Sequence, residues 1–155
     1  MQIRPLMDNP DYLAQTSDLL FREWSSLALW ADEEKIQARL IARNASDSSQ
    51  ITLVAIDTEN RVIATASLVH YELNDNPQRM HWLGEIITKP SHRGQGTGTL
   101  LINALIKHAS EQKMTELWLY TPDMQPLYRK LGWEEKETRI VDGESVSLMV
   151  LNLDK

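Results

Sequence analysis

Two segments near the N-terminus carry apolar residues at roughly helical spacing, so that each segment would have one apolar face. The apolar positions are Leu13, Leu20, Trp24 and Leu27 in the first segment, and Ile36, Leu40 and Ile41 in the second. Asn9 can cap the first segment with Pro10 at its first helical position, and the second begins at Asp32. The pattern therefore predicts two consecutive helices, each with one apolar face.

The rest of the chain alternates between strand-like and helix-like runs. Runs typical of strands occupy residues 2–6, 51–57, 62–71, 82–88, 117–120, 133–140 and 146–153. Further helices are predicted from about 97 to 113 and from an Asp123 cap to Leu131, where Gly132 ends the second one. Polar residues at 44–50, 58–61 and 72–78 predict connections, of which the middle one is a hairpin turn.

The predicted order of elements is β-α-α-β-β-β-α-β-α-β-β. Strands and helices in this order bury their apolar faces as a mixed sheet with helices on both faces, which is an α/β architecture. No internal repeat, low-complexity run or linker divides residues 1–155, so we expect a single domain.

Composition narrows the class of protein. An apolar content of 42% and a charged content of 25% are typical of soluble globular proteins, and a cytoplasmic protein is expected because neither a signal peptide nor a membrane span is evident. The net charge of −6 argues against nucleic acid or an anionic membrane as partner. The absence of cysteine removes disulfides and a thiolate nucleophile, and no histidine spacing suggests a metal site.

The most informative segment is the glycine-rich run from Arg93 to Thr99, between a strand and a helix. Gly94, Gly96 and Gly98 let the backbone approach a bulky ligand, and the first turn of the following helix has unpaired N–H groups at the positive end of its dipole. This combination predicts a site for a phosphate or pyrophosphate.

Three kinds of glycine loop compete for this segment. A phosphate-binding P-loop is excluded because Thr99 and Leu100, rather than a lysine, follow the last glycine. A dinucleotide fingerprint needs its third glycine where Thr99 stands, although Asp123 lies at a suitable distance downstream. A turn that binds no ligand is the remaining interpretation.

A family resemblance resolves the competition. Arg93-x-x-Gly96-x-Gly98, after a turn containing Pro90, resembles the pyrophosphate loop of the GNAT superfamily of acyl-CoA-dependent N-acetyltransferases. The downstream segment Leu127-Tyr128-Arg129-Lys130-Leu131-Gly132-Trp133 resembles a second motif of that superfamily. The close resemblance covers about residues 81 to 134, and it implies a mostly antiparallel sheet.

The resemblance implies acetyl-CoA as cosubstrate and a set of residues that bind it. Backbone N–H groups of residues 94–99 would line the pyrophosphate, main-chain groups of 86–88 would pair with the pantetheine arm, and Arg93 would contact a phosphate or brace the loop. The expected cofactor-binding residues are Ile86, Ile87, Thr88, Arg93, Gly94, Gln95, Gly96, Thr97, Gly98 and Thr99.

The resemblance also implies catalytic roles. The phenol of Tyr128, with an ordinary pKa near 10, would protonate the departing thiolate. The general base is expected on the strand ending at Thr88, where strict alternation places His81, Leu83, Glu85 and Ile87 on one face. Glu85 is the first candidate for this base, His81 is the second, and a bound water or a charge without catalytic duty remains open.

The expected function is therefore transfer of an acetyl group from acetyl-CoA to a primary amine, by direct attack in a ternary complex. The alternatives are an acyl-CoA-binding sensor or regulatory module without catalysis, and a nucleotide-binding oxidoreductase. Trp24 and Trp30 flank the turn that forms one wall of the acceptor site in GNAT folds. The sequence does not identify the amine, and it is compatible with a monomer or a homodimer.

Overall fold

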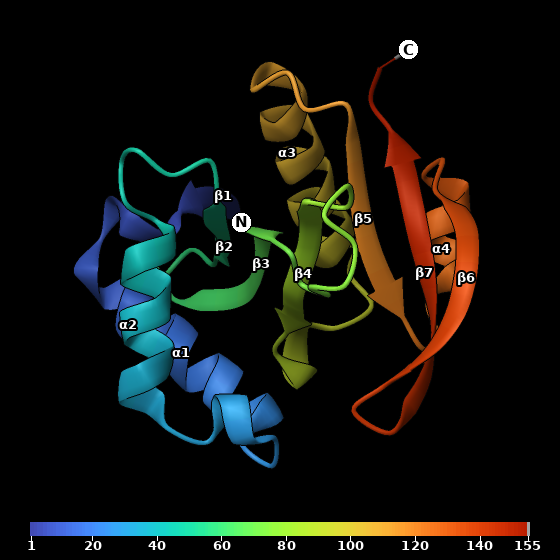
Figure 1. Cartoon of the computed structure of the whole chain (residues 1–155). Helices are drawn as coiled ribbons and strands as arrows, with labels where there is room; N and C mark the ends of the chain where they lie inside the picture. The colour runs from blue at the N-terminus through green and yellow to red at the C-terminus, as the bar shows by residue number, and fades with distance from the viewer. Residues whose placement is uncertain (155) are drawn as a thin grey trace.

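The computed structural model describes residues 1–154, and these form one seven-stranded sheet in the order β1-β2-β3-β4-β5-β7-β6 (Figure 1). The strands are β1 (Gln2–Pro5), β2 (Ile51–Ile56), β3 (Val62–His70), β4 (His81–Thr88), β5 (Glu116–Thr121), β6 (Glu134–Val141) and β7 (Glu144–Asn152). Neighbouring strands are antiparallel except for the parallel pair β4 and β5. The predicted order of elements and the mixed, mostly antiparallel sheet are confirmed.

The helices begin close to the predicted positions. They are α1 (Pro10–Trp24), α2 (Glu33–Arg43), α3 (Thr97–Glu111) and α4 (Gln125–Lys130), with short 3-10 turns at Leu6–Asp8, Ala28–Trp30 and Pro90–His92. The side chain of Asn9 accepts a hydrogen bond from the Asp11 N–H at 2.9 Å, and that of Asp32 accepts from the second and third residues of α2. The predicted Asn9 cap is therefore present, and Asp32, where the second helix was expected to begin, is its capping residue.

The cap predicted at Asp123 is wrong. Helix α4 begins two residues later, at Gln125, and Met124 occupies the capping position. The N–H of Met124 donates to Thr121 Oγ1 at 3.0 Å, so the end of β5 rather than Asp123 fixes the entry to the helix. Pro126 lies in the first turn, where a missing N–H removes no helical hydrogen bond.

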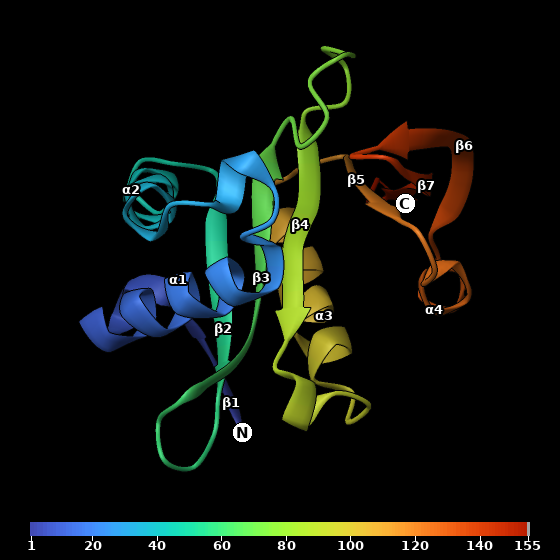
Figure 2. The ribbon, with the colours of Figure 1, turned by 90° about the horizontal axis from the view of Figure 1, so that it is seen from below.

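Helices cover both faces of the sheet (Figure 2). Helices α1 and α2 bury one apolar cluster that includes Leu20, Ile36 and Leu40. Helix α3 buries a second cluster against the other face, which Tyr128 of α4 also joins. No helix among residues 1–154 is long and apolar enough to cross a membrane.

Strands β4 and β5 are paired at only one point, where Trp82 lies opposite Trp118. Both indoles are buried, and their ring centroids lie 6.0 Å apart. Beyond this pair, toward their C-terminal ends, the two strands are not hydrogen-bonded to each other. The two strands are therefore paired at the tryptophans and separate beyond them, at Gly84 on β4 and Tyr120 on β5.

Candidate active site

A cavity of about 1150 Å³ lies at the split between β4 and β5. Its walls come from the second half of β4, the glycine loop, the first turn of α3, the end of β5 with α4, the α1–α2 connection and the β6–β7 turn. The two motifs recognised in the sequence therefore meet around one cavity.

The glycine loop presents backbone to this cavity. Eight of the ten predicted cofactor-binding residues line it, whereas Gln95 and Thr97 do not. Gly96 is the capping residue of α3, and within the described chain no side chain accepts hydrogen bonds from the first turn. The free N–H groups of that turn and the helix dipole make this end of the cavity suited to an anion.

Gly94 and Gly96 differ from Gly98 in backbone conformation. Gly94 and Gly96 have φ angles of 78° and 82°, which residues other than glycine rarely adopt. Space is not the reason, because an added Cβ at either position would meet nothing within 4 Å. Gly98 lies in the first turn of α3, and its φ is not positive. An added Cβ at this position would lie 4.0 Å from Thr88 Oγ1, which is an ordinary contact distance. The backbone conformation of Gly96 therefore favours glycine in itself, in addition to the expected close approach of a ligand.

Arg93 braces the loop. Its Nε donates a hydrogen bond to the Thr88 carbonyl at 2.9 Å, and its guanidinium lies 3.5 Å from the carboxylate of Glu23 on α1. The side chain therefore ties the loop to the end of β4 and to α1, which is one of the two roles expected for it.

The strict alternation predicted for β4 is wrong. A β-bulge interrupts the pairing of β3 with β4, so that Thr65 pairs with Ile87 while Ser67 pairs with Gly84. Glu85 lies in the bulge with a φ of 55°. Because of the additional residue, Leu83 packs on the α3 side whereas Ile87 packs on the side of α1 and α2.

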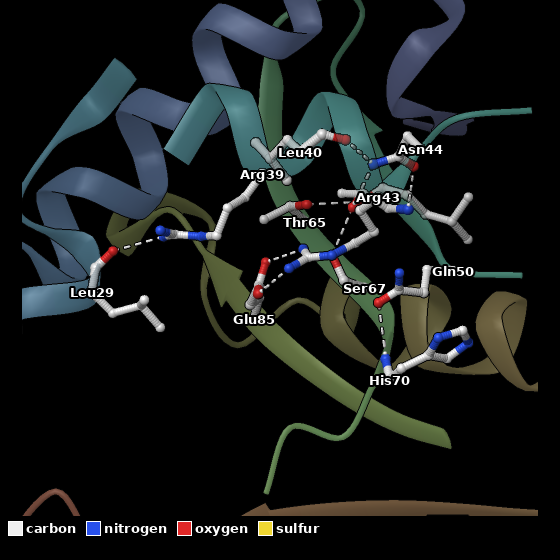
Figure 3. A network of polar contacts seen from close by, with 12 residues as sticks. Leu29, Arg39, Leu40, Arg43, Asn44, Gln50, Thr65, Ser67, His70 and Glu85 are labelled. Atoms are coloured by element: carbon white, nitrogen blue, oxygen red, sulfur yellow. Dashed lines mark hydrogen bonds and ion pairs between the residues drawn. The ribbon is translucent and has the colours of Figure 1, made fainter. Parts of the chain in front are cut away.

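Glu85 forms a bidentate ion pair with Arg43 at the end of α2 (Figure 3). The Nη1–Oε1 distance is 2.5 Å and the Nη2–Oε2 distance is 2.8 Å. The neighbouring Asn44 fixes this end of α2 to β2, because its side chain accepts from the Thr52 N–H at 2.7 Å and donates to Thr52 Oγ1. Both carboxylate oxygens of Glu85 are thus engaged by one guanidinium.

A second carboxylate lies beside Glu85. Glu72, in the β3–β4 connection, lines the cavity, and a Cβ added to Gly84 would come within 2.9 Å of its carboxylate. Burial raises the pKa of Glu72 to about 7; the charge of Glu85 adds to this rise and that of Arg43 opposes it. Glu72 therefore changes charge near neutral pH.

His81, the second candidate for the general base, does not line the cavity. It precedes the split and packs edge-on against His70, with ring centroids 5.5 Å apart. Burial lowers its pKa, and the charge of His70 lowers it further. The structure thus places this imidazole away from the other candidate residues.

Two tyrosines face the cavity from β5 and α4. Tyr128 is buried, packs edge-on against Trp133 at 6.0 Å and has a pKa raised to about 12 by burial and by the charge of Asp123. The pKa of Tyr120 is also raised to about 12, by burial and then by four carboxylates, those of Glu72, Asp142, Glu144 and Glu85. Both phenols remain protonated at neutral pH.

Trp24 at the end of α1 and Trp30 in the α1–α2 connection line the cavity, with ring centroids 5.3 Å apart. The guanidinium of Arg39 lies over the Trp30 ring at 4.9 Å, and one of its N–H groups donates to the Leu29 carbonyl. The predicted aromatic wall is therefore part of the cavity.

Sequence reasoning missed three residues of this cavity or its support, namely Arg43, Glu72 and Tyr120. Arg43 resembles any cation in the last turn of a helix, and Glu72 any acid in a polar loop. Tyr120 lies in the predicted strand 117–120, where an aromatic residue is typical of a core position. Only the folded arrangement brings these residues together.

Comparison with solved structures places this fold among acetyltransferases. A putative acetyltransferase from Salmonella typhimurium with its cofactor acetyl-CoA matches with a TM-score of 0.79 and 18% identity, covering 100% of this chain and 95% of that one. A ribosomal-protein-alanine N-acetyltransferase from Brucella melitensis matches with a TM-score of 0.78 and 20% identity, covering 98% and 99%. An aminoglycoside 6'-N-acetyltransferase complexed with coenzyme A matches with a TM-score of 0.75 and 16% identity, covering 99% and 97%.

Sequence comparisons agree with the fold. A curated relative, an uncharacterized N-acetyltransferase of Methanocaldococcus jannaschii, is 40% identical over 57 residues, which are 34% of this chain and 25% of that protein. The chain therefore matches only about a quarter of that relative's length. The family model of the acetyltransferase (GNAT) family matches residues 13–133, most of the chain, and the protein belongs to that family.

Proposed function

We propose that this protein transfers the acetyl group of acetyl-CoA to a primary amine, by direct attack in a ternary complex. The observation that carries the proposal is the single cavity that joins the glycine loop, the split between β4 and β5, and Tyr128. Acetyl transfer from a thioester of coenzyme A requires three features: an anion site for the pyrophosphate, a channel along a strand for the pantetheine arm, and a proton donor for the leaving thiolate.

The residues fit acetyl-CoA along the length of the cavity. The pyrophosphate would bind at the N–H groups of residues 94–99, with Arg93 holding the loop in place. From there the pantetheine arm would follow β4 backward, from Thr88 to Ile86, and pair with main-chain groups that β5 leaves free. The thioester would then lie near Gly84, where the split begins.

Tyr128 is the residue for protonating the leaving group. Its raised pKa keeps the phenol protonated, and a developing thiolate is an acceptor for that proton. Since the chain has no cysteine, a cysteine acyl-enzyme cannot form, which supports direct attack of the amine on the thioester.

The alternative is a module that binds acyl-CoA without catalysis. It needs the glycine loop but neither a buried phenol nor a titratable carboxylate at the thioester end, and this cavity contains both. We therefore favour the enzyme. Localisation in the cytoplasm remains an expectation from the sequence.

The test is release of coenzyme A thiol from acetyl-CoA, measured across spermidine, lysine, an aminoglycoside, a peptide with a free N-terminus and a lysine-containing protein. The proposal predicts release that depends on at least one amine and saturates with it, with the N-acetyl product identified by mass spectrometry. Binding of acetyl-CoA without amine-dependent release would instead support the non-catalytic module.

A further inference from the structure

We propose that Glu72, rather than Glu85 or His81, accepts the proton of the acceptor's ammonium group. The inference rests on the proposed function and names the catalytic residue that it leaves unassigned. It begins from position: the carboxylate of Glu72 lies against the backbone of Gly84, at the inner end of the cavity where β4 and β5 separate.

The position of Gly84 fixes where the proton acceptor must lie. Gly84 lies four positions before Thr88, which is at most about 13 Å along the strand because the bulge at Glu85 shortens it. An arm anchored at the loop after Thr88 and running back along β4 therefore brings its thioester toward Gly84. Glu72 is the carboxylate in direct contact with this glycine, since any side chain at position 84 would collide with it.

Glu72 is also free to accept a proton. No hydrogen bond joins its carboxylate to another residue within 1–154, whereas both oxygens of Glu85 are held by Arg43. Protonating Glu85 would break a bidentate pair and leave the Arg43 guanidinium buried without its partner. Protonating Glu72 breaks no such contact.

The charges around Glu72 suit this role. Glu85 on β4 and Arg43 on α2 face it as a neutral pair, Tyr120 faces it from β5, and Asp142 and Glu144 lie across the cavity on the β6–β7 turn. This acidic surrounding attracts an ammonium group. Burial, with a smaller contribution from the charge of Glu85, raises the pKa of Glu72 to about 7, in the range where a general base works best.

The ammonium group of the acceptor transfers one proton to the Glu72 carboxylate, and the neutral nitrogen attacks the thioester carbonyl carbon. The new C–N bond forms, the C–S bond breaks, and the thiolate takes the proton of the Tyr128 hydroxyl. The nitrogen loses its second proton, which restores the phenol through solvent, and Glu72 releases its proton to solvent, so the net reaction liberates one proton.

The test compares pH profiles of kcat/KM for wild type and Glu72→Gln, using the amine of the panel that releases thiol fastest. In the wild type, kcat/KM should rise to a plateau with an inflection near pH 7. In Glu72→Gln only amine that is already neutral can react, so the plateau should vanish. We expect kcat/KM to fall about 100-fold or more at pH 7 and to climb about tenfold per pH unit toward the amine's own pKa.

Two further variants separate catalysis from charge. Glu144→Gln removes another carboxylate from the same cavity and should retain the plateau and an inflection. Gly84→Ala should displace the Glu72 carboxylate without backbone strain and should lower kcat/KM while acetyl-CoA affinity holds. If the Glu72→Gln substitution raised only KM and the wild-type plateau remained, the assignment of Glu72 as the base would be wrong, whereas the proposed acetyltransferase function would stand. If no amine promotes thiol release, the proposed function and this assignment fail together.

Discussion

Arg43 and Glu85 form a buried bidentate ion pair that joins the last turn of α2 to the bulge in β4. Their side chains are only 12% and 6% exposed, so the pair is shielded from solvent screening. Both residues act on Glu72, and they do so in opposite directions: the charge of Glu85 raises the pKa of Glu72, and that of Arg43 lowers it. The pair therefore sets the electrostatic environment of the carboxylate beside Gly84.

Glu85→Gln tests which of the two carboxylates is the base. The variant removes a charge that raises the pKa of Glu72 and leaves the charge of Arg43, which lowers it. If Glu72 is the base, the inflection of kcat/KM should move to lower pH while the plateau survives. If Glu85 is the base, as the family resemblance suggested, the plateau should disappear. Steady-state kinetics from pH 5 to pH 10 distinguish these outcomes.

The contrast between these carboxylates shows where sequence reasoning stops. Glu85 stood out in the sequence as a charge within an apolar strand, but its bulge depends on the pairing with β3. Its partner Arg43 lies 42 residues away, and Glu72 was one acid in a polar loop. Positions that depend on contacts between distant segments left no local signal.

Features set by neighbouring residues were predictable. Asn9 caps its helix as expected, and the second helix begins within one residue of the expected Asp32, because a helix start requires only the correct side chain next to the first turn. The glycine loop is likewise local, since Gly94 and Gly96 provide the positive φ angles that lead into α3. Asp123 failed as a cap because Thr121, at the end of β5, binds the Met124 N–H instead.

Gly98→Val should weaken acetyl-CoA binding at least tenfold while leaving the fold intact. The φ of Gly98 is not positive, so valine at this position causes no backbone strain. The valine side chain would instead project into the space where the backbone approaches the pyrophosphate. Calorimetric titration measures the affinity, and the melting temperature without ligand monitors the fold. Gly96→Val is the matched contrast: with a φ of 82° it should lower the melting temperature as well.

Tyr128→Phe retains the ring that packs on Trp133 and removes the proton donor. We expect kcat to fall about tenfold or more, since general acid catalysis contributes roughly 10²–10⁴-fold, with little change in acetyl-CoA affinity. A pre-steady-state burst measurement shows whether product release hides the chemical step. An unchanged rate of that step would make Tyr128 a packing residue only.

Glu72→Gln should stabilise the protein at pH 8. The pKa of Glu72 in the folded state, about 7, lies above the 4.5 of the free side chain, so folding favours the protonated form. The resulting stability is complete below about pH 4.5 and is lost as the pH rises through 7. Glutamine stays neutral, so we expect a gain of about 2 kcal/mol at pH 8 that shrinks toward pH 5.

Urea unfolding of both proteins at pH 5 and pH 8 measures this difference without any substrate. The comparison isolates Glu72, because all other titrating groups are shared by the two proteins. Equal stabilities at both values of pH would mean that the carboxylate is solvated in the cavity and titrates like a free side chain.

Calorimetric titration with acetyl-CoA tests most directly whether the cavity at the split of β4 and β5 is the cofactor site. We predict one site per chain in the wild type, a raised melting temperature in the presence of the ligand, and affinity weakened at least tenfold in Gly98→Val. NAD and ATP, titrated in the same way, should bind much more weakly. Tight binding of NAD with none of acetyl-CoA, or acetyl-CoA affinity unchanged in Gly98→Val, would contradict the assignment of this cavity.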